Sequence, residues 1–151
     1  MNLKNIYRHE KYMELAIEKA KNGRDSESGG AFGAVIVHND EIIVEVYNQV
    51  AGKNDPTQHA ELLAIQEACK KIGKNKLKEC ILYTSCEPCM MCLGACYWAK
   101  FKAIYYGASA EDAKENGYVY SNSYFDMNSD LRRGEFHLIQ LMRNEALEVW
   151  K

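Results

Sequence analysis

The stretch FGAVIVHNDEIIVEVY (residues 32–47) decides the fold of this chain, because it holds two β-branched runs joined by a short polar turn. The runs Phe32 to Val37 and Glu41 to Tyr47 predict two strands, and His38-Asn39-Asp40 between them predicts a hairpin. A sheet that begins in this way must bury its apolar faces against other elements. The flanking sequence should therefore supply helices.

Helical and extended patterns do alternate along the rest of the chain. Residues 11–22 predict an amphipathic helix that stops at Gly23. A second helix is expected from the capping residues Asp55-Pro56 to a stop at Gly73. Further on we expect the strand Cys80–Thr84, the helix Glu87–Trp98, the strand Ala103–Tyr106, the short helix 111–115, the strand 136–142 and the helix 144–151. Residues 117–133 give no clear prediction. The alternation indicates an α/β fold, a three-layer α-β-α sandwich.

Composition limits the possible classes of protein. A chain of 151 residues with 47% hydrophobic and 26% charged residues fits a single globular domain, residues 1–151. The net charge of -2 argues against a nucleic-acid partner, because proteins that bind nucleic acids usually carry an excess of basic residues. No run approaches the roughly 20 apolar residues of a membrane span, and the N-terminus lacks a signal-peptide core. The six cysteines then indicate reduced thiols, metal binding and a cytoplasmic location.

The segments His59-Ala60-Glu61 and Cys86-Glu87-Pro88-Cys89 carry the residue types of a catalytic zinc site. His59, Cys86 and Cys89 are the predicted ligands, and three protein ligands leave one tetrahedral position open. Both pairs lie near predicted helix starts, where the helix dipole favours thiolate. Glu61 is predicted to be the catalytic acid–base, which takes a proton from a metal-activated water.

The other cysteines have a simpler interpretation. Cys92 and Cys96 lie at helical spacing among apolar residues and are predicted to be core, as are Cys69 and Cys80. A non-catalytic, zinc-stabilised interaction module is the alternative class of function. It predicts a fourth protein ligand, such as Cys92, and indifference to the loss of the Glu61 carboxylate. Trp98 and Trp150 fit a core, an interface or a pocket equally well.

Three longer segments carry a family resemblance: GGAFGAVIV (residues 29–37), NDPTQHAE (54–61) and TSCEPCMMCLGA (84–95). With them the chain resembles the cytidine/deoxycytidylate deaminase-like superfamily, whose nucleobase enzymes carry an H-x-E…P-C-x-x-C signature. It is most similar to bacterial guanine deaminases. The resemblance covers about residues 29–113. It implies a five-stranded mixed sheet between helix layers, bound Zn²⁺ and a homodimer.

The resemblance also implies how substrate would be bound. Asn48 matches the asparagine that hydrogen-bonds the base, and Phe32 matches the aromatic residue that packs on the ring. The backbone N–H of Ala60 would help to orient the base, and Glu145 would match a glutamate of the pocket from the C-terminal segment. The implied reaction is hydrolytic deamination of a small nucleobase, guanine to xanthine with release of ammonia.

The chain departs from that pattern in Gly117-Tyr118-Val119-Tyr120, where guanine deaminases tend to show Gly-Phe-Asp-Asp. Tyr120 replaces the aspartate that would read the base. Buried polar groups discriminate strongly between ligands, so the loss bears on substrate choice rather than on hydrolysis. A tRNA adenosine deaminase and a deaminase of another free base, nucleoside or pterin-like amine stay open as alternatives.

Overall fold

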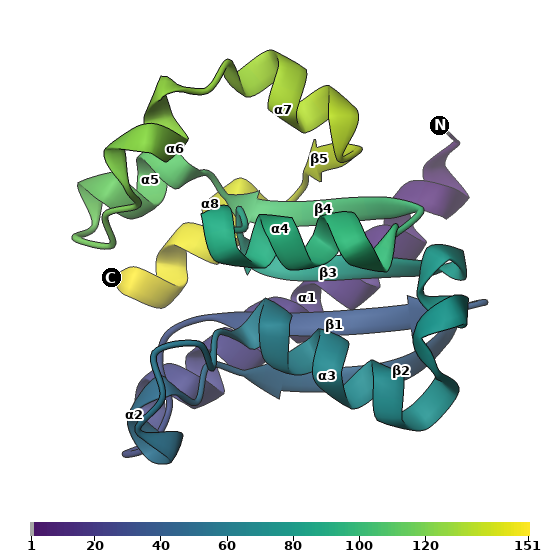
Figure 1. Ribbon diagram of the computed structural model, residues 1–151, viewed down its shortest axis with the longest axis horizontal. Coiled ribbons are helices and arrows are strands. Elements are labelled where there is room, and N and C mark those ends of the chain that lie inside the picture. The colour runs from purple at the N-terminus through teal and green to yellow at the C-terminus, as the bar shows by residue number, and fades with distance from the viewer. Residues whose placement is uncertain (1) are drawn as a thin grey trace.

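A computed structural model of the protein describes residues 2–151 and contains one five-stranded sheet (Figure 1). The strands follow the order β2-β1-β3-β4-β5. β1 pairs antiparallel with both β2 and β3, whereas β3–β4 and β4–β5 are parallel, so the sheet is mixed as expected. The strands are β1 (Gly33–His38), β2 (Glu41–Tyr47), β3 (Cys80–Cys86), β4 (Ala103–Ala108) and β5 (Leu138–Gln140).

The predicted hairpin between β1 and β2 is confirmed. Its two turn residues, Asn39 and Asp40, have φ values of 49° and 64°. Two successive left-handed residues are the mark of a type I′ turn, which asparagine and aspartate tolerate well and which matches the twist of the strands. His38 then faces Glu41 across the turn. The register shifts once between Ile36 and Val37, and the pairing ends with Gly33 opposite Tyr47.

Helices cover both faces of the sheet, which confirms the α-β-α layers. In Figure 1, α3 (Ala60–Ile72) and α4 (Met90–Ala99) lie in front of the sheet, and α1 (Leu3–Asp25) and α8 (Arg143–Leu147) lie behind it. Successive strand residues point to opposite faces. The front face accordingly buries Ala34, Ile36, Leu82 and Ile104, and the rear face buries Val35, Val37, Tyr83 and Tyr105.

The long helix α1 lies unusually close to β1 because of Gly33. A Cβ atom at position 33 would lie 2.1 Å from the carbonyl oxygen of Ala16 and 2.6 Å from the amide nitrogen of Ala20. Both of those alanines are fully buried. Small residues on both elements therefore allow helix and strand backbones to touch.

The remaining elements are short. They are α2 (Val50–Lys53), the 3-10 helix η1 (Lys74–Glu79), α5 (Ala110–Glu115), α6 (Asn122–Asp126), α7 (Ser129–Glu135) and the 3-10 helix η2 (Glu148–Trp150). Figure 1 shows α6 and α7 forming an arch above the β4 side of the sheet. These two helices occupy the segment for which the sequence made no prediction. None of the helices within residues 2–151 is both long enough and apolar enough to cross a bilayer.

Two predicted helix starts were wrong. The second helix begins at Ala60, because the Asp55 carboxylate instead accepts hydrogen bonds from the backbone and the hydroxyl of Thr57 and closes a local turn. The third begins at Met90 rather than Glu87, because the Glu87 N–H still bonds the Ala108 carbonyl and extends the strand ladder. The last strand is also shorter than expected.

Candidate metal centre and cavity

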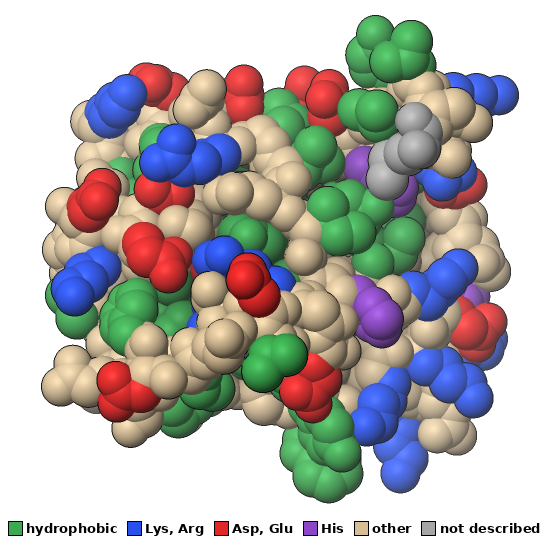
Figure 2. Space-filling view, turned by 90° about the horizontal axis from the view of Figure 1, so that it is seen from above, with side chains coloured by type: hydrophobic (Ala, Val, Ile, Leu, Met, Phe, Trp, Pro, Cys, Tyr) green, Lys and Arg blue, Asp and Glu red, His purple; other side chains and the backbone are tan. Residues whose placement is uncertain are grey.

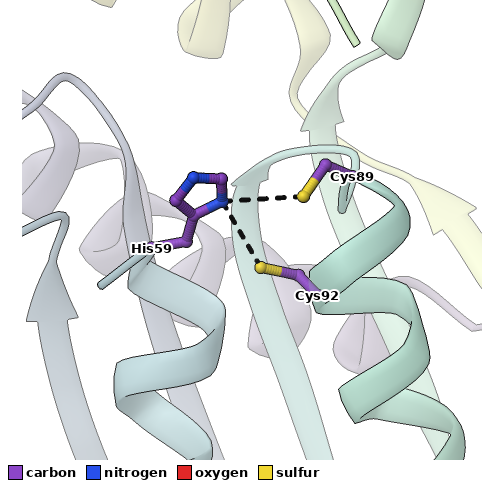
Figure 3. Close-up of side chains that lie close together, drawn as sticks. All are labelled: His59, Cys89 and Cys92. Carbon is purple, nitrogen blue, oxygen red and sulfur yellow. Dashed lines mark hydrogen bonds between the residues drawn. The ribbon is translucent and has the colours of Figure 1, made fainter. Parts of the chain in front are cut away.

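The first residues of α3 and α4 meet and bring three ligand side chains together. His59 is the N-cap of α3, Cys89 is the N-cap of α4, and Cys92 lies in the first turn of α4. The Nδ1 atom of His59 lies 3.6 Å from the Sγ atom of Cys89 and 3.6 Å from the Sγ atom of Cys92 (Figure 3). Within residues 2–151 this is the one group of three or more ligand side chains whose donor atoms all lie within 4.8 Å of one another.

Cys86, a predicted ligand, does not belong to this group, and the predicted ligand set needs correction. Cys86 ends β3, and its Sγ atom lies 3.1 Å from the Tyr120 hydroxyl. Cys86 is the last residue of β3, and the Glu87 N–H still bonds the Ala108 carbonyl, so Cys86 keeps the orientation of a sheet residue. An N-cap residue and the third helical residue instead point over the same helix end. Cys92, predicted to be core, therefore takes the place given to Cys86. The signal for Cys92 was present in the sequence, because the P-C-x-x-C signature reads Pro88-Cys89-Met90-Met91-Cys92.

Electrostatics favour a thiolate in this cluster. Hydrogen bonds from the Cys92 thiol and from His59 lower the pKa of Cys89 to about 4. The hydrogen bond to Cys89 in turn raises the pKa of His59 above its ordinary value. The hydrogen bond to Cys89 and burial raise the pKa of the Cys92 thiol, and burial raises that of Cys86, so Cys89 is the thiolate of this region. The dipoles of two helix N-termini add to the preference for negative sulfur.

The spacing of the donors fits zinc. In a tetrahedral site with Zn–N near 2.0–2.1 Å and Zn–S near 2.3 Å, nitrogen and sulfur lie about 3.6 Å apart. Both nitrogen–sulfur distances here are 3.6 Å. One imidazole and two thiols are also donors that a borderline-soft divalent ion prefers. Three such donors leave one tetrahedral position for a ligand that is not protein.

A cavity of about 270 Å³ opens beside the cluster. It brings together six of the site residues that the sequence predicted: Phe32, Asn48, His59, Glu61, Cys86 and Cys89. Ala60, between His59 and Glu61, is fully buried at the first position of α3. The complete lining is Phe32, Asn48, His59, Glu61, Cys86, Cys89, Tyr118, Val119 and Tyr120.

Glu145 is not among the residues that line the cavity of the single chain, so its place in the pocket stays a prediction. It lies on α8 and is exposed. The next residue, Ala146, is buried against β4, where a Cβ atom on Gly107 would come within 2.5 Å of the Ala146 Cβ. Helix α8 therefore uses its alanine face for packing and directs Glu145 elsewhere.

Glu61 is the buried carboxylate of the cavity. It lies in the first turn of α3 and is 6% exposed. Burial, together with the negative charge on Cys89, raises the pKa of Glu61 to about 7. Its oxygens are not part of the close ligand cluster, although both sets of atoms border the same cavity. A carboxyl group with such a pKa can accept and return a proton near neutral pH.

Asn48 is fixed by hydrogen bonds that do not involve its side-chain amide nitrogen. Its Oδ1 atom accepts the N–H of Val50 at 3.0 Å, and its backbone pairs with Gly30 and with Phe32. A side chain at Gly30 would approach the Asn48 Oδ1 to 2.8 Å, so the glycine makes this arrangement possible. Within residues 2–151 the Asn48 amide NH₂ has no acceptor, which leaves two donors at the cavity.

The rings of Phe32 and Tyr118 form an aromatic wall of the cavity, and Trp150 packs against both of them. The rings of Phe32 and Tyr118 meet edge to face at 4.9 Å, and the ring of Trp150 lies 5.6 Å from Phe32 and 5.1 Å from Tyr118. The indole N–H of Trp150 donates to the Ala31 carbonyl at 3.0 Å. Tyr118 and Val119 were not predicted as cavity residues. Tyr120, which stands where the resemblance places a base-reading aspartate, does line the cavity.

Known proteins resemble this chain over most of its length. Residues 6–108 match the cytidine and deoxycytidylate deaminase zinc-binding region. The guanine deaminase of Bacillus subtilis (strain 168) is 44% identical over 146 residues, 95% of this chain and 94% of that protein. An X-ray structure of guanine deaminase from Bacillus subtilis, 48% identical, covers 86% of this chain and 80% of its own with a TM-score of 0.74. The tRNA-specific adenosine deaminase of Aquifex aeolicus (strain VF5) is 40% identical over 111 residues, 73% of this chain and 71% of that protein.

Proposed function

The chain belongs to the cytidine and deoxycytidylate deaminase family, and on this premise we propose that it hydrolyses the amino group of a small aminated purine. Guanine is the foremost substrate, since the Bacillus subtilis relative, 44% identical over 95% of this chain, is named for it. Water adds to the ring carbon that bears the amino group, the carbon–nitrogen bond breaks, and ammonia leaves. The ring keeps the oxygen, which gives xanthine from guanine.

His59, Cys89 and Cys92 would hold Zn²⁺. The 3.6 Å separations between the imidazole nitrogen and the two sulfurs support this ligand set. When bound, zinc lowers the pKa of a coordinated water from 15.7 to about 7 and so supplies a nucleophile at neutral pH. The thiolate state of Cys89, favoured by its neighbours, is the form that binds a metal.

Glu61 would carry the protons of the reaction. Its carboxylate takes a proton from the attacking water and passes it to the departing nitrogen, so the group ends the cycle as it began. Burial beside the metal ligands supports this role, because a carboxyl group with a pKa of about 7 exchanges protons readily at neutral pH. General acid–base help of this kind contributes about 10²–10⁴-fold in rate.

The ring would bind between the aromatic wall and α3. The Asn48 amide donates to an acceptor on the base, and the Phe32 ring packs on its face. The N–H of Ala60 lies in the first turn of α3, where backbone donors lack partners within the helix. A cavity of about 270 Å³ suits one planar ring system.

One observation carries the proposal above all others: a buried carboxylate, Glu61, shares a cavity with His59 and Cys89. The test is Glu61→Gln, measured for bound zinc and for ammonia release from guanine. We expect one zinc per chain and a loss of at least 10²-fold in kcat. Full activity in that variant would remove Glu61 from the mechanism. A wild type that binds zinc but releases no ammonia would favour a non-catalytic zinc module.

The tRNA adenosine deaminases remain the second candidate, because one of them shares 40% identity over 73% of this chain. To distinguish the two candidate functions, ammonia release is measured under one set of conditions. The substrates are guanine, guanosine, adenine, cytosine, cytidine and a tRNA anticodon stem-loop. We expect guanine to be the best substrate. Turnover of the stem-loop alone would overturn the assignment to a free base.

We also propose a homodimer that pairs through the outer face of α4. Four large apolar side chains on this helix are exposed, and Trp98 at 79% is the most exposed of them; the others are Met90, Met91 and Tyr97. Hydrophobic side chains stand out at the lower edge of Figure 2, the side on which α4 lies. Exposed apolar patches of this kind often mark interfaces. Light scattering of wild type and Trp98→Asp should give a dimer and a monomer, and a monomeric wild type would overturn the pairing.

The compartment we propose is the cytoplasm. All six cysteines are free thiols within residues 2–151, and free thiols persist where the surroundings are reducing. Fractionation of cells that express the chain, with immunodetection of each fraction, tests this location.

A further inference from the structure

We propose that Glu87 is a positioning residue for the metal centre. Its buried carboxylate, clamped by Arg132 and Arg133, fixes the turn that presents Cys89 and anchors residues 117–135, which supply one wall of the cavity. The inference rests on the proposed metal site. It assigns no chemical step to Glu87.

Both oxygens of the Glu87 carboxylate are fully used. Oε1 accepts the backbone N–H of Ala110 at 2.9 Å and the Nη2 of Arg133 at 3.0 Å. Oε2 accepts the Nη2 of Arg132 at 3.1 Å and the Nε of Arg133 at 3.0 Å. The Glu87 side chain is 0% exposed. A buried carboxylate with four donors, two of them from one arginine fork, is geometrically fixed.

The two arginines are fixed in their turn by aromatic rings. The Arg132 side chain is 4% exposed, and its guanidinium lies 4.3 Å from the centre of the fully buried Tyr124 ring. The Arg133 guanidinium lies 5.6 Å from the Tyr106 ring of β4. Cations stacked on ring faces in this way are held in one orientation. Both arginines belong to α7, so the clamp joins α7 to the end of β3.

The backbone of Glu87 is held as firmly as its side chain. Its N–H donates to the Ala108 carbonyl at 2.8 Å, and its own carbonyl accepts the Tyr120 hydroxyl. Tyr120 also lies 3.1 Å from the Cys86 sulfur and lines the cavity. Glu87 is therefore the point at which the sheet, α7 and the cavity wall are tied together.

This tie matters because Cys89 follows two residues later. Metal ligands must keep their distances within about 0.2 Å to bind well. One residue of chain spans more than 3 Å, so freedom at Glu87 would shift Cys89 by more than that tolerance. Hydrogen-bonding partners behind metal ligands are typically worth 10- to 100-fold in metal affinity.

Glu87→Gln tests the idea on the zinc-loaded protein. Glutamine keeps the shape, but it loses the charge that balances the two arginines. The main measurement is zinc release to a colorimetric chelator. We expect metal affinity to fall 10- to 100-fold. Hydrogen exchange should also become faster across residues 117–135.

Asp112→Asn is the matched control. Asp112 makes a similar double contact with an arginine, Arg143, at 2.6 and 2.8 Å, but that pair does not touch the turn before Cys89. We expect this variant to melt at a lower temperature and to retain zinc as wild type does. If Glu87→Gln and Asp112→Asn lost zinc equally, the loss would reflect lower stability of the whole protein, and the proposal would be overturned.

Arg133→Met and Arg133→Lys cover the case in which Glu87→Gln fails to fold. The Arg133 side chain is 27% exposed, so its loss is easier to accommodate. Methionine should weaken zinc retention, and lysine should restore part of it through its charge. Unchanged retention in both Glu87→Gln and Arg133→Met would overturn the positioning role. A wild-type protein that holds zinc but deaminates nothing would instead defeat the proposed function and leave this inference standing.

Discussion

Replacing one cysteine at a time distinguishes the two possible ligand sets. Cys92→Ala removes a sulfur that lies 3.6 Å from the His59 Nδ1, whereas Cys86→Ala removes one whose neighbour is the Tyr120 hydroxyl at 3.1 Å. Both thiols are buried, so each variant also pays a similar packing cost. The two variants should therefore differ in metal binding far more than in stability.

The expected difference follows from ligand counting. Zinc binding to four-ligand sites is worth about 10–16 kcal/mol, or about 2.5–4 kcal/mol for each ligand if they contribute equally. With tenfold in affinity for every 1.4 kcal/mol, Cys92→Ala should weaken zinc binding roughly 10²- to 10³-fold. Cys86→Ala loses one hydrogen bond, worth about 0.5–1.5 kcal/mol of folding free energy, and should bind zinc as wild type does.

The assay is zinc per chain by elemental analysis after purification, followed by competition with a chelator of known affinity. Circular dichroism on the same samples shows whether each variant is folded. Zinc content is a better readout than activity, because Cys86 borders the cavity and its loss can alter catalysis. If Cys86→Ala lost zinc while Cys92→Ala kept it, the ligand set of His59, Cys89 and Cys92 would be refuted.

Three further predictions concern packing, substrate binding and acid stability. Gly33→Ala places a Cβ atom 2.1 Å from the Ala16 carbonyl oxygen, so α1 must move away from β1; we expect a loss of about 1–3 kcal/mol, seen as a lower melting temperature in calorimetry. Trp150→Ala removes a ring that packs on two residues of the cavity wall, Phe32 and Tyr118, with each pair worth about 0.5–1.5 kcal/mol. Steady-state kinetics should show KM raised about tenfold with kcat much less affected, and an unchanged KM would show that Trp150 does not support the cavity wall. The Arg143 guanidinium lowers the pKa of Asp112 from 3.8 to about 2; because the folded pKa is the lower one, this carboxylate stabilises the protein above pH 4, and the contribution is lost as the pH falls from 4 towards 2. The melting temperatures of wild type and Asp112→Asn should therefore differ near neutral pH and converge towards pH 2, and a constant gap would count against the pair.

Elements with strong local signals could be predicted from the sequence. The β1–β2 hairpin is specified by two β-branched runs and by Asn39 and Asp40, which tolerate left-handed backbone. The alternation of strands and helices was enough to predict the layers. His59 and Glu61 belong to one short motif, His59-Ala60-Glu61, so their position close to the start of a helix could also be predicted from local sequence.

Features that depend on distant contacts could not be predicted. Residues 117–135 are held by Arg132 and Arg133 on Glu87, a residue more than forty positions away, so no local pattern marks them. The start of α4 was misplaced because Pro88 resembles a first helical residue, whereas pairing with Ala108 keeps Glu87 extended. The ligand pair, by contrast, could have been predicted, because the P-C-x-x-C signature matches Pro88, Cys89 and Cys92 and leaves Cys86 outside it.

The N-cap residues of α3 and α4 have a consequence for the life of the protein. Neither His59 nor Cys89 makes a side-chain capping hydrogen bond, so neither end has the usual protection of a helix start. An ion held by both residues would act as one cap shared by two helices. Withdrawal of that ion would leave two adjacent helix ends free to fray at once, and frayed ends are where proteases cut first. The supply of metal would then govern how long each copy escapes degradation, apart from any effect on turnover.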